Sequence, residues 1–343
     1  MDPETESLSL PVPHQSTTGC PFHTLYVWSA MTRRGLLSLA VGAIAIGLTL
    51  PVARAQAPAA AGLPFKTDVT VAPLPALAQQ VPEPLRSGGV LTIATNPNTP
   101  PTVFVMDDNR TLAGREIDIM SAVAHRLGLE PHWVNAGGFG NIVPGLSSGR
   151  YQAALANLSV TAERLTQVDF VSYFNSNRLG LVRAKQGAPE TPATDLMGLC
   201  GDTIGAGSGT TNADVLLRQS EACVAAGRKP ITVPLFPGRP AGVQAVLSGR
   251  VPGFFGPFEG LRYMVSVSHD ALAMTGVYQV PSDFVGIGLQ KGSPLTPLVA
   301  QALSSLIADG TYAAILHKWD LDFGAVAEAR QNGAILDAAP TRP

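Results

Sequence analysis

The sequence predicts an α/β protein built on an open, largely parallel sheet. Short apolar runs typical of buried strands alternate along the chain with amphipathic stretches of helical period. This alternation favours parallel pairing, because each helix carries the chain back to the start of the next strand. The 255 residues from 89 to 343 can bury a large core, and their number suggests one or two domains.

The predicted elements follow one another in a regular order. The first strand is expected at residues 90–94, followed by a helix at 116–127 that ends before Gly128. The apolar residues of this helix share one face: Ile117, Met120, Val123, Ala124 and Leu127. Further strands are expected at residues 151–156, 203–206, 231–235, 251–255 and 284–289, and helices at 298–307 and 312–319. The last helix has Tyr312, Ile315, Leu316 and Trp319 at the spacing of one helical face.

Composition excludes several classes of protein. Charged residues make up 14% of the chain, the net charge is −2, and no basic run exists, so we expect no nucleic-acid partner. The six histidines are scattered without i,i+4 pairing, so we expect no metal site and no cofactor. Beyond the N-terminal region no apolar stretch reaches the ~20 residues that span a bilayer.

The N-terminal region has the three parts of a secretory signal peptide. Arg33 and Arg34 follow an internal start candidate, Met31, and a mostly apolar run covers residues 36–50. Two Ala-x-Ala cleavage sites follow at residues 53–57, so residues 1–57 are expected to be an upstream extension plus signal peptide. The paired arginines are similar to a twin-arginine signal. An uncleaved membrane anchor is the alternative.

The next segment, residues 58–88, is rich in Ala, Pro and Leu and shows no clear period. We expect it to be a tether or a loosely packed arm. Residues 326–343 are expected to form a C-terminal tail.

A polar stretch directly after the strand 151–156 is the first candidate binding segment. It contains Asn157, Ser159 and Arg164 within eight residues. A guanidinium is a permanently charged planar fork for a carboxylate, and hydroxyl and backbone N–H groups can occupy the remaining lone pairs. This combination predicts a site for a small anion. The alternative is that Arg164 is a solvated helix residue or pairs with Glu163 or Asp169.

A second candidate segment runs from Ala206 to Asn212 and includes Ser208, Gly209, Thr210 and Thr211. It follows a strand and precedes a helical pattern. Small and hydroxyl residues at a helix N-terminus present free N–H groups and the positive end of the helix dipole to an anion. An ordinary capped turn between strand and helix is the alternative.

The chain has three cysteines, and Cys20 lies in the upstream extension. The remaining two, Cys200 and Cys223, are expected to form a disulfide, because cysteine pairs in exported proteins are commonly oxidised.

Several ordered motifs resemble the periplasmic solute-binding proteins of polar amino-acid ABC transporters, the bacterial extracellular solute-binding protein family 3. The resemblance covers roughly residues 89–321. Its motifs are Leu91-Thr92-Ile93-Ala94, Gly138-Phe139, Ile142-Val143-Pro144-Gly145-Leu146, Gly149-Arg150-Tyr151, the Asn157 to Arg164 stretch with Val168-Asp169-Phe170, and Asp309-Gly310-Thr311-Tyr312 with Lys318-Trp319.

The resemblance implies a two-lobed periplasmic-binding-protein fold of type II, with two open mixed sheets joined by a two-strand hinge. Carried onto this sequence, the first lobe comprises residues 89–181 and 287–325 and the second lobe comprises residues 182–286. The crossovers are then expected near Leu181-Val182 and Gly286-Ile287.

The family pattern also implies roles for the candidate residues. Arg164, Asn157 and Ser159 would hold the ligand carboxylate from the first lobe. Ser208, Gly209, Thr210 and Thr211 would clamp it from the second lobe, and Phe139 would stack on the ligand. A packing role for Phe139 is the alternative.

Three positions depart from the family pattern, and one of them, Gln152 in place of an Asp, is expected to be structural. Family members that bind amino acids hold the α-ammonium with an acidic residue after the strand that follows Gly249-Arg250, and Pro257 stands there. Thr99 occupies the place of a stacking aromatic. An unpaired buried ammonium is costly, so we expect a small carboxylate or an amino acid whose amine is masked. The competing hypothesis is an ordinary amino acid with Glu259 as counter-ion.

The resemblance therefore implies an extracytoplasmic binding protein that captures a small carboxylate-bearing ligand and delivers it to an ABC transporter permease. We expect a periplasmic monomer without catalytic residues. One alternative is a dehydratase-like enzyme on the same fold, for which Glu259 and Asp169 are the acid–base candidates. A ligand-sensing module is the other.

Overall fold

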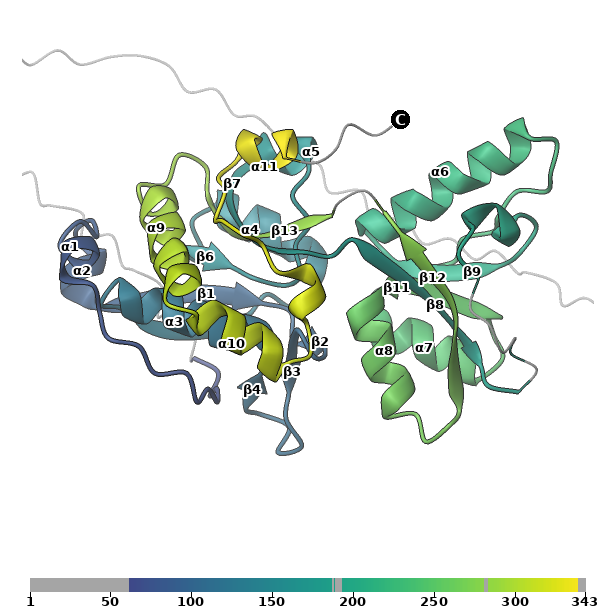
Figure 1. Cartoon of the computed structure of the whole chain (residues 1–343), viewed down its shortest axis with the longest axis horizontal. Coiled ribbons are helices and arrows are strands. Elements are labelled where there is room, and N and C mark those ends of the chain that lie inside the picture. Colours follow the sequence, from purple (N-terminus) through teal and green to yellow (C-terminus); the bar gives the residue numbers. More distant parts are fainter. Residues whose placement is uncertain (1–61, 187, 189–192, 281–282, 339–343) are drawn as a thin grey trace, which may run out of the picture. The chain divides into compact units, whose positions relative to one another are not determined.

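The computed structural model describes residues 62–186, 188, 193–280 and 283–338 (Figure 1). All of them belong to one compact unit, residues 57–343. The expected signal peptide and upstream extension lie outside the described residues.

The first of two large sheets has five strands in the order β5-β1-β6-β13-β7. These are β1 (Val90–Thr95), β5 (Glu130–Asn135), β6 (Ala153–Ala154), β7 (Val168–Asn175) and β13 (Phe284–Gln290). Strand β1 pairs in parallel with β5 and β6, whereas β13 pairs antiparallel with β6 and β7. The sheet is therefore mixed, as the family resemblance implied, whereas the alternation of strands and helices alone had favoured a largely parallel sheet.

The second large sheet has the order β10-β9-β11-β8-β12. Its strands are β8 (Arg178–Ala184), β9 (Ile204–Gly207), β10 (Leu235–Phe236), β11 (Gly253–Pro257) and β12 (Leu272–Gln279). Strands β9, β10 and β11 run in parallel, and β8 lies antiparallel between β11 and β12. A small third sheet joins β2 (Asn98–Thr99), β3 (Val103–Val105) and β4 (Leu112–Ala113).

The helices cover the faces of these sheets (Figure 1). The described α-helices are α1 (Pro75–Ala78), α2 (Leu85–Gly88), α3 (Arg115–Arg126), α4 (Ile142–Ser147), α5 (Ala162–Leu165), α6 (Thr211–Ala225), α7 (Arg239–Leu247), α8 (Phe258–Ser266), α9 (Leu295–Ala308), α10 (Thr311–Lys318) and α11 (Gly333–Asp337). Three 3₁₀ turns are η1 (Phe139–Asn141), η2 (Leu196–Leu199) and η3 (Asp322–Gly324). No single described helix is long and apolar enough to cross a membrane.

The chain passes between the two large sheets twice, as the two-lobed type II fold requires. It leaves the first sheet after Asn175 and enters the second at Arg178, then leaves after Gln279 and re-enters the first at Phe284. The expected crossover positions were too late in both cases. Leu181 pairs with Phe255 inside the second sheet, and Gly286 pairs with Ser172 inside the first. The strands before and after each passage are buried and apolar. Hydrophobicity alone therefore did not show at which residue the chain leaves one sheet and enters the other.

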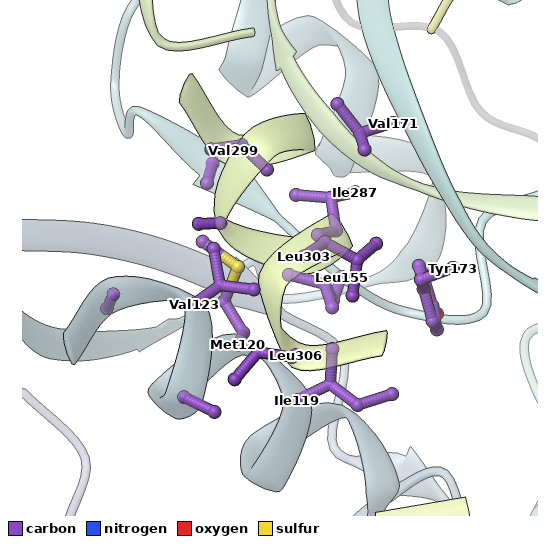
Figure 2. Close-up of a cluster of buried hydrophobic side chains, with 14 of the residues drawn as sticks. Ile119, Met120, Val123, Leu155, Val171, Tyr173, Ile287, Val299, Leu303 and Leu306 are labelled. Atoms are coloured by element: carbon purple, nitrogen blue, oxygen red, sulfur yellow. The ribbon is translucent and has the colours of Figure 1, made fainter. Parts of the chain in front are cut away.

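The core of the first sheet lies beneath α3 and α9, which pack against each other (Figure 1). Figure 2 shows side chains that meet there, and the following are fully buried: Ile119, Met120 and Val123 of α3, Val299, Leu303 and Leu306 of α9, Ile287 of β13, and Leu155 directly after β6. Burying one such side chain contributes about 1.5–3 kcal/mol. The helical period predicted at 116–127 thus corresponds to the contact face of α3.

Two expected strands are shorter than predicted. In place of 151–156 only Ala153–Ala154 forms a strand, and in place of 231–235 only Leu235–Phe236 does. Pro234 has no N–H to donate, and its carbonyl accepts from Ala206 at 3.0 Å, so the edge strand pairs only partly.

The segments before and after the main fold pack on it. Leu77 and Val81 are buried in the core of the first sheet, and Leu63 forms a bridge with Trp133, so residues 62–88 are not a loose tether. The expected tail is also structured over residues 326–338. Gln331 bridges Val171 of β7, and Ile335 in α11 is fully buried.

Candidate ligand-binding site

A cleft lies where the carboxyl ends of strands from both large sheets meet. The space between its walls is ≈ 690 Å³, a figure that includes open solvent. Eight of the predicted site residues line it: Thr99, Phe139, Asn157, Ser159, Arg164, Ser208, Thr210 and Thr211. Two predicted residues in the described part of the chain, Gly209 and Glu259, do not.

Arg164 lies in α5 and reaches from the first sheet toward the second. Its Nη1 donates to the carbonyl of Ser159 at 2.7 Å and its Nη2 donates to the carbonyl of Gly209 at 3.1 Å. The guanidinium carbon lies 5.4 Å from the centre of the Phe139 ring. Burial lowers the pKa of Arg164, and nearby carboxylates, foremost Asp283, oppose this shift. A guanidinium stays protonated in proteins, so Arg164 is a cation.

Hydroxyl groups from the two sheets meet beside this cation. Ser159 Oγ and Thr211 Oγ1 are 3.1 Å apart. Thr210 has a different task. It is the N-cap of α6, where its hydroxyl accepts from the N–H of Ala213 at 3.3 Å and donates to the carbonyl of Gly207 at 2.8 Å. The second candidate segment is therefore a capped turn at Thr210 and places a cleft-lining hydroxyl at Thr211.

Asn157 lines the cleft and also connects it to a buried polar network. Its N–H donates to Glu116 Oε1 at 2.6 Å, and its side-chain oxygen accepts from Arg115 Nη2 at 2.9 Å. Its Nδ2 donates to Glu259 Oε1 at 3.3 Å. Burial raises the pKa of Glu116, and the Arg115 guanidinium opposes that shift. The left-handed backbone of Asn157, with φ of 51°, directs these three contacts.

Glu259 is buried in the first turn of α8 and accepts from Ser176 Oγ at 3.2 Å as well as from Asn157. Its carboxylate contacts Asn157 and Ser176, and Glu259 is not among the residues that line the cleft, where the competing hypothesis requires a counter-ion. The reason is helical: Pro257 ends β11 and precedes the first turn of α8, which turns position 259 away from the strand end. Pro257 itself lines the cleft.

The structure adds residues that sequence reasoning missed. Asn96, Asn98, Asn212, Arg239 and Asp283 also line the cleft. Arg239 follows Pro237-Gly238 at the start of α7. This junction of strand, turn and helix is like that of the second candidate segment, and the same reasoning could have identified Arg239 as a cleft residue. Asp283 lies in the second passage between the sheets, which the sequence placed elsewhere.

Asp169, the other acid–base candidate, lies away from the cleft. Its Oδ2 accepts from the N–H of Gly292 at 3.0 Å and from Thr296 Oγ1 at 3.3 Å, and its Oδ1 is 3.2 Å from Lys291 Nζ. These contacts join β7 to the start of α9, so Asp169 has a structural role.

The predicted disulfide between Cys200 and Cys223 is present. It connects the end of η2 to the last turns of α6, the helix whose N-terminus faces the cleft. The bond therefore secures α6 at the end opposite the cleft.

Comparisons with known proteins agree with this architecture. Residues 91–322 match the family model of bacterial extracellular solute-binding proteins, family 3. The chain is 28% identical over 263 residues to the arginine-binding protein ArgT of Corynebacterium glutamicum, an alignment that covers 76% of this chain and 84% of that protein.

Solved structures show the same fold. An ancestral arginine-binding protein bound to arginine superposes with a TM-score of 0.58 at 26% identity, covering 67% of this chain and 98% of that one. The ancestral amino acid-binding protein AncCDT-1, a precursor of cyclohexadienyl dehydratase, superposes with a TM-score of 0.56 at 22% identity, covering 68% and 97%. With the family match spanning most of the fold, the chain belongs to the bacterial extracellular solute-binding proteins, family 3, of amino-acid ABC transporters.

Proposed function

We propose that this protein captures a small carboxylate-bearing ligand in the cleft and delivers it to the permease of an ABC transporter. One observation carries the proposal. Arg164 and Ser159 from the first sheet meet Thr211 from the second, with the two hydroxyl oxygens 3.1 Å apart. A cation and two hydroxyl donors converging from opposite walls suit one carboxylate.

The ligand carboxylate would replace contacts that the site now makes internally. Arg164 would turn its two Nη donors from the Ser159 and Gly209 carbonyls to the carboxylate oxygens. The N-terminus of α6, 15 residues long, adds its free N–H groups and positive dipole end. Binding would favour the arrangement in which both walls reach the ligand, a shift of population toward the closed state.

The charges in the cleft argue against a cationic ligand, although the relatives named above bind arginine. Among the described residues its lining contains two arginines, Arg164 and Arg239, and one carboxylate, Asp283. A ligand guanidinium would meet like charge near Arg239. We therefore propose a ligand without a cationic side chain, whose amine is absent or masked. If an ammonium is present, Asp283 is better placed than Glu259 to accept it.

The relatives favour capture without catalysis, and so do the structural contacts of Glu259 and Asp169, the two acid–base candidates. Glu259 is engaged by Asn157 and Ser176, and Asp169 by the start of α9. An enzyme would need a proton donor or acceptor in the cleft. Asp283 is the group on which the dehydratase alternative would depend.

The family and the disulfide support a periplasmic location, because such bonds persist in oxidising compartments. We retain cleavage near residues 55–57 and a monomeric state as proposals. We also propose that the two large sheets belong to two lobes. The hinge between the lobes would then be formed by the two passages of the chain, one from Asn175 to Arg178 and one from Gln279 to Phe284.

The test is calorimetric titration of the mature chain from Gln56 with L-arginine, L-glutamine, L-glutamate, N-acetyl-L-glutamine and succinate. We expect binding of a carboxylate probe and a loss of about 10- to 100-fold in affinity in Arg164→Gln, because charge-assisted hydrogen bonds contribute about 1.5–3 kcal/mol. Arg250→Gln, an exposed charge away from the cleft, is the matched control. Equal affinity in wild type and Arg164→Gln would refute this site.

A further inference from the structure

Arg239 is a second buried cation in the cleft wall. It is the first residue of α7, is 7% exposed, and lines the cleft. A glycine makes room for it: a Cβ on Gly260 of α8 would lie 1.8 Å from Arg239 Nη1. The guanidinium thus lies flat against the backbone of α8, at a place that no other residue type could leave open.

The guanidinium of Arg239 has few partners among the described residues. Its one hydrogen bond goes from Nη1 to the carbonyl of Pro100, on the opposite wall, at 3.3 Å. None of the described ion pairs includes Arg239. Its Nε and Nη2 have no partner there, and neither atom is fully enclosed by protein. Donors of this kind are available to a group in the cleft.

Neighbouring carboxylates do not neutralise this cation directly. Burial lowers the pKa of Arg239, and Glu259 opposes that shift. However, Glu259 already accepts from Asn157 and Ser176 and lies outside ion-pairing distance. Asp283, the carboxylate in the cleft lining, acts on Arg164.

The helix adds to the local positive potential. Among the described residues no side chain caps α7, whose N-cap is Gly238. Pro240 has no N–H and Gly242 donates to the carbonyl of Gly238 at 3.2 Å, so the free N–H groups of the first turn are those of Arg239 and Ala241. Together with the Arg239 fork, they form a pocket of donors that suits a negatively charged group.

We propose that Arg239 and the first turn of α7 form a second anion subsite, and that the ligand carries two negative groups. One group would bind Arg164 and the other Arg239, as in a small dicarboxylate or an acidic amino-acid derivative. This inference rests on the proposed function, because it takes the Arg164 site as the place of the first carboxylate.

A purely structural role for Arg239 makes a different prediction. As a contact between the walls through Pro100, Arg239 would affect all ligands alike. As an anion subsite, it would affect only ligands with a second charge. Matched probes that differ in that charge alone therefore separate the two roles.

The experiment is calorimetric titration of the mature chain with two such pairs, succinate against succinamate and L-glutamate against L-glutamine. In wild type we expect the dianionic or acidic member to bind at least about tenfold more tightly. In Arg239→Gln this preference should fall to less than about twofold, with the affinity for the amide member changing less than about threefold. The Arg250→Gln control should keep the wild-type preference.

A second variant covers the case in which Arg239→Gln does not fold. Gly260→Ala retains the charge but places a methyl group where the guanidinium lies, and it should also reduce the preference. An amide member that binds as well as its acid in wild type would overturn the inference, and so would a preference that survives in both variants. In either case the proposed function stands if Arg164→Gln still loses affinity, and it falls with the inference if no carboxylate probe binds.

Discussion

At the residue scale, Asn157 joins the cleft to the interior. Its side chain contacts Arg115 at the start of α3 at 2.9 Å and Glu259 in the first turn of α8 at 3.3 Å. Arg115 is fully buried, and its Nε and Nη1 have no partner among the described residues. Its guanidinium carbon lies 4.0 Å from the centre of the Phe174 ring. Asn157 therefore supplies the hydrogen bond of a buried cation.

We predict that Asn157→Gly lowers the free energy of unfolding by about 1.5–3 kcal/mol, because a buried charged donor loses its acceptor. Asn157→Ala should cost roughly 1 kcal/mol more, because a Cβ without a polar group disfavours positive φ. Urea unfolding measures both differences. The matched control is Asn109, exposed and also left-handed, with φ of 57°. There the alanine penalty should remain, while the glycine variant should match wild type.

At the element scale, α6 has different tasks at its two ends. Its N-terminus presents Thr211 to the cleft and is capped by Thr210, while Cys223 near its C-terminus is bonded to Cys200. The disulfide spans 23 residues of sequence. The helix between the ends packs Ala213 and Leu216 on the second sheet. Stability and ligand contact are therefore separated along one helix.

We predict that replacing both Cys200 and Cys223 by alanine lowers the free energy of unfolding by about 3 kcal/mol, since the unfolded chain gains loop entropy. Ligand affinity should change less than about threefold, because the N-terminal turn keeps its cap. Wild type unfolded with reductant present should reproduce the loss. A variant that kept its stability but lost affinity would show that the bond shapes the cleft.

At the scale of the whole molecule, loops and helices next to the two large sheets contact each other at several points around the cleft. These contacts are Asn157 with Glu259, Ser159 with Thr211, Arg164 with Gly209, and Arg239 with Pro100. Beside the cleft, Arg262 of α8 donates to the carbonyl of Asp320 at 2.7 Å. Ligand binding must exchange some of these contacts for new ones, so affinity measures the difference between two sets of polar contacts.

The first lobe carries a pH-dependent part of the total stability. Burial raises the pKa of Tyr312 to about 12, while its hydroxyl donates to the carbonyl of Tyr173 at 2.8 Å and accepts from the N–H of Val326 at 3.0 Å. Burial also raises the pKa of Tyr173 well above its ordinary value. A raised pKa means that the folded state keeps its proton longer. Stability is therefore complete below about pH 10 and is lost as the pH rises toward 12.

We predict that Tyr312→Phe reduces this alkaline loss. Between pH 8 and pH 11 the wild-type residue alone should account for about 1.4 kcal/mol of lost unfolding free energy, and the variant should lack that part. Urea unfolding at both pH values measures it. The value at pH 8 is the internal control, because it reports the two lost hydrogen bonds without ionisation. An unchanged pH dependence would place the titrating group elsewhere.

The sequence by itself determined what depends on local pattern. The contact faces of α3 and α10, the buried strands β1 and β13, and the disulfide follow from period, apolarity and export signals. The candidate residues Arg164, Ser159 and Thr211 lie in short, continuous segments in which hydroxyls and an arginine follow strand ends, and the family resemblance implied their proposed roles.

Only the tertiary structure decided what depends on direction and partner. Glu259 points to Ser176 and Asn157 because a helical turn rotates it, whereas Arg239 enters the cleft because Gly260, 21 positions later, leaves space. Residues 62–88 pack because a distant sheet offers an apolar face. The direction of a side chain, and the space left for it by residues distant in sequence, depend on how the whole chain packs. A local sequence pattern therefore cannot predict them.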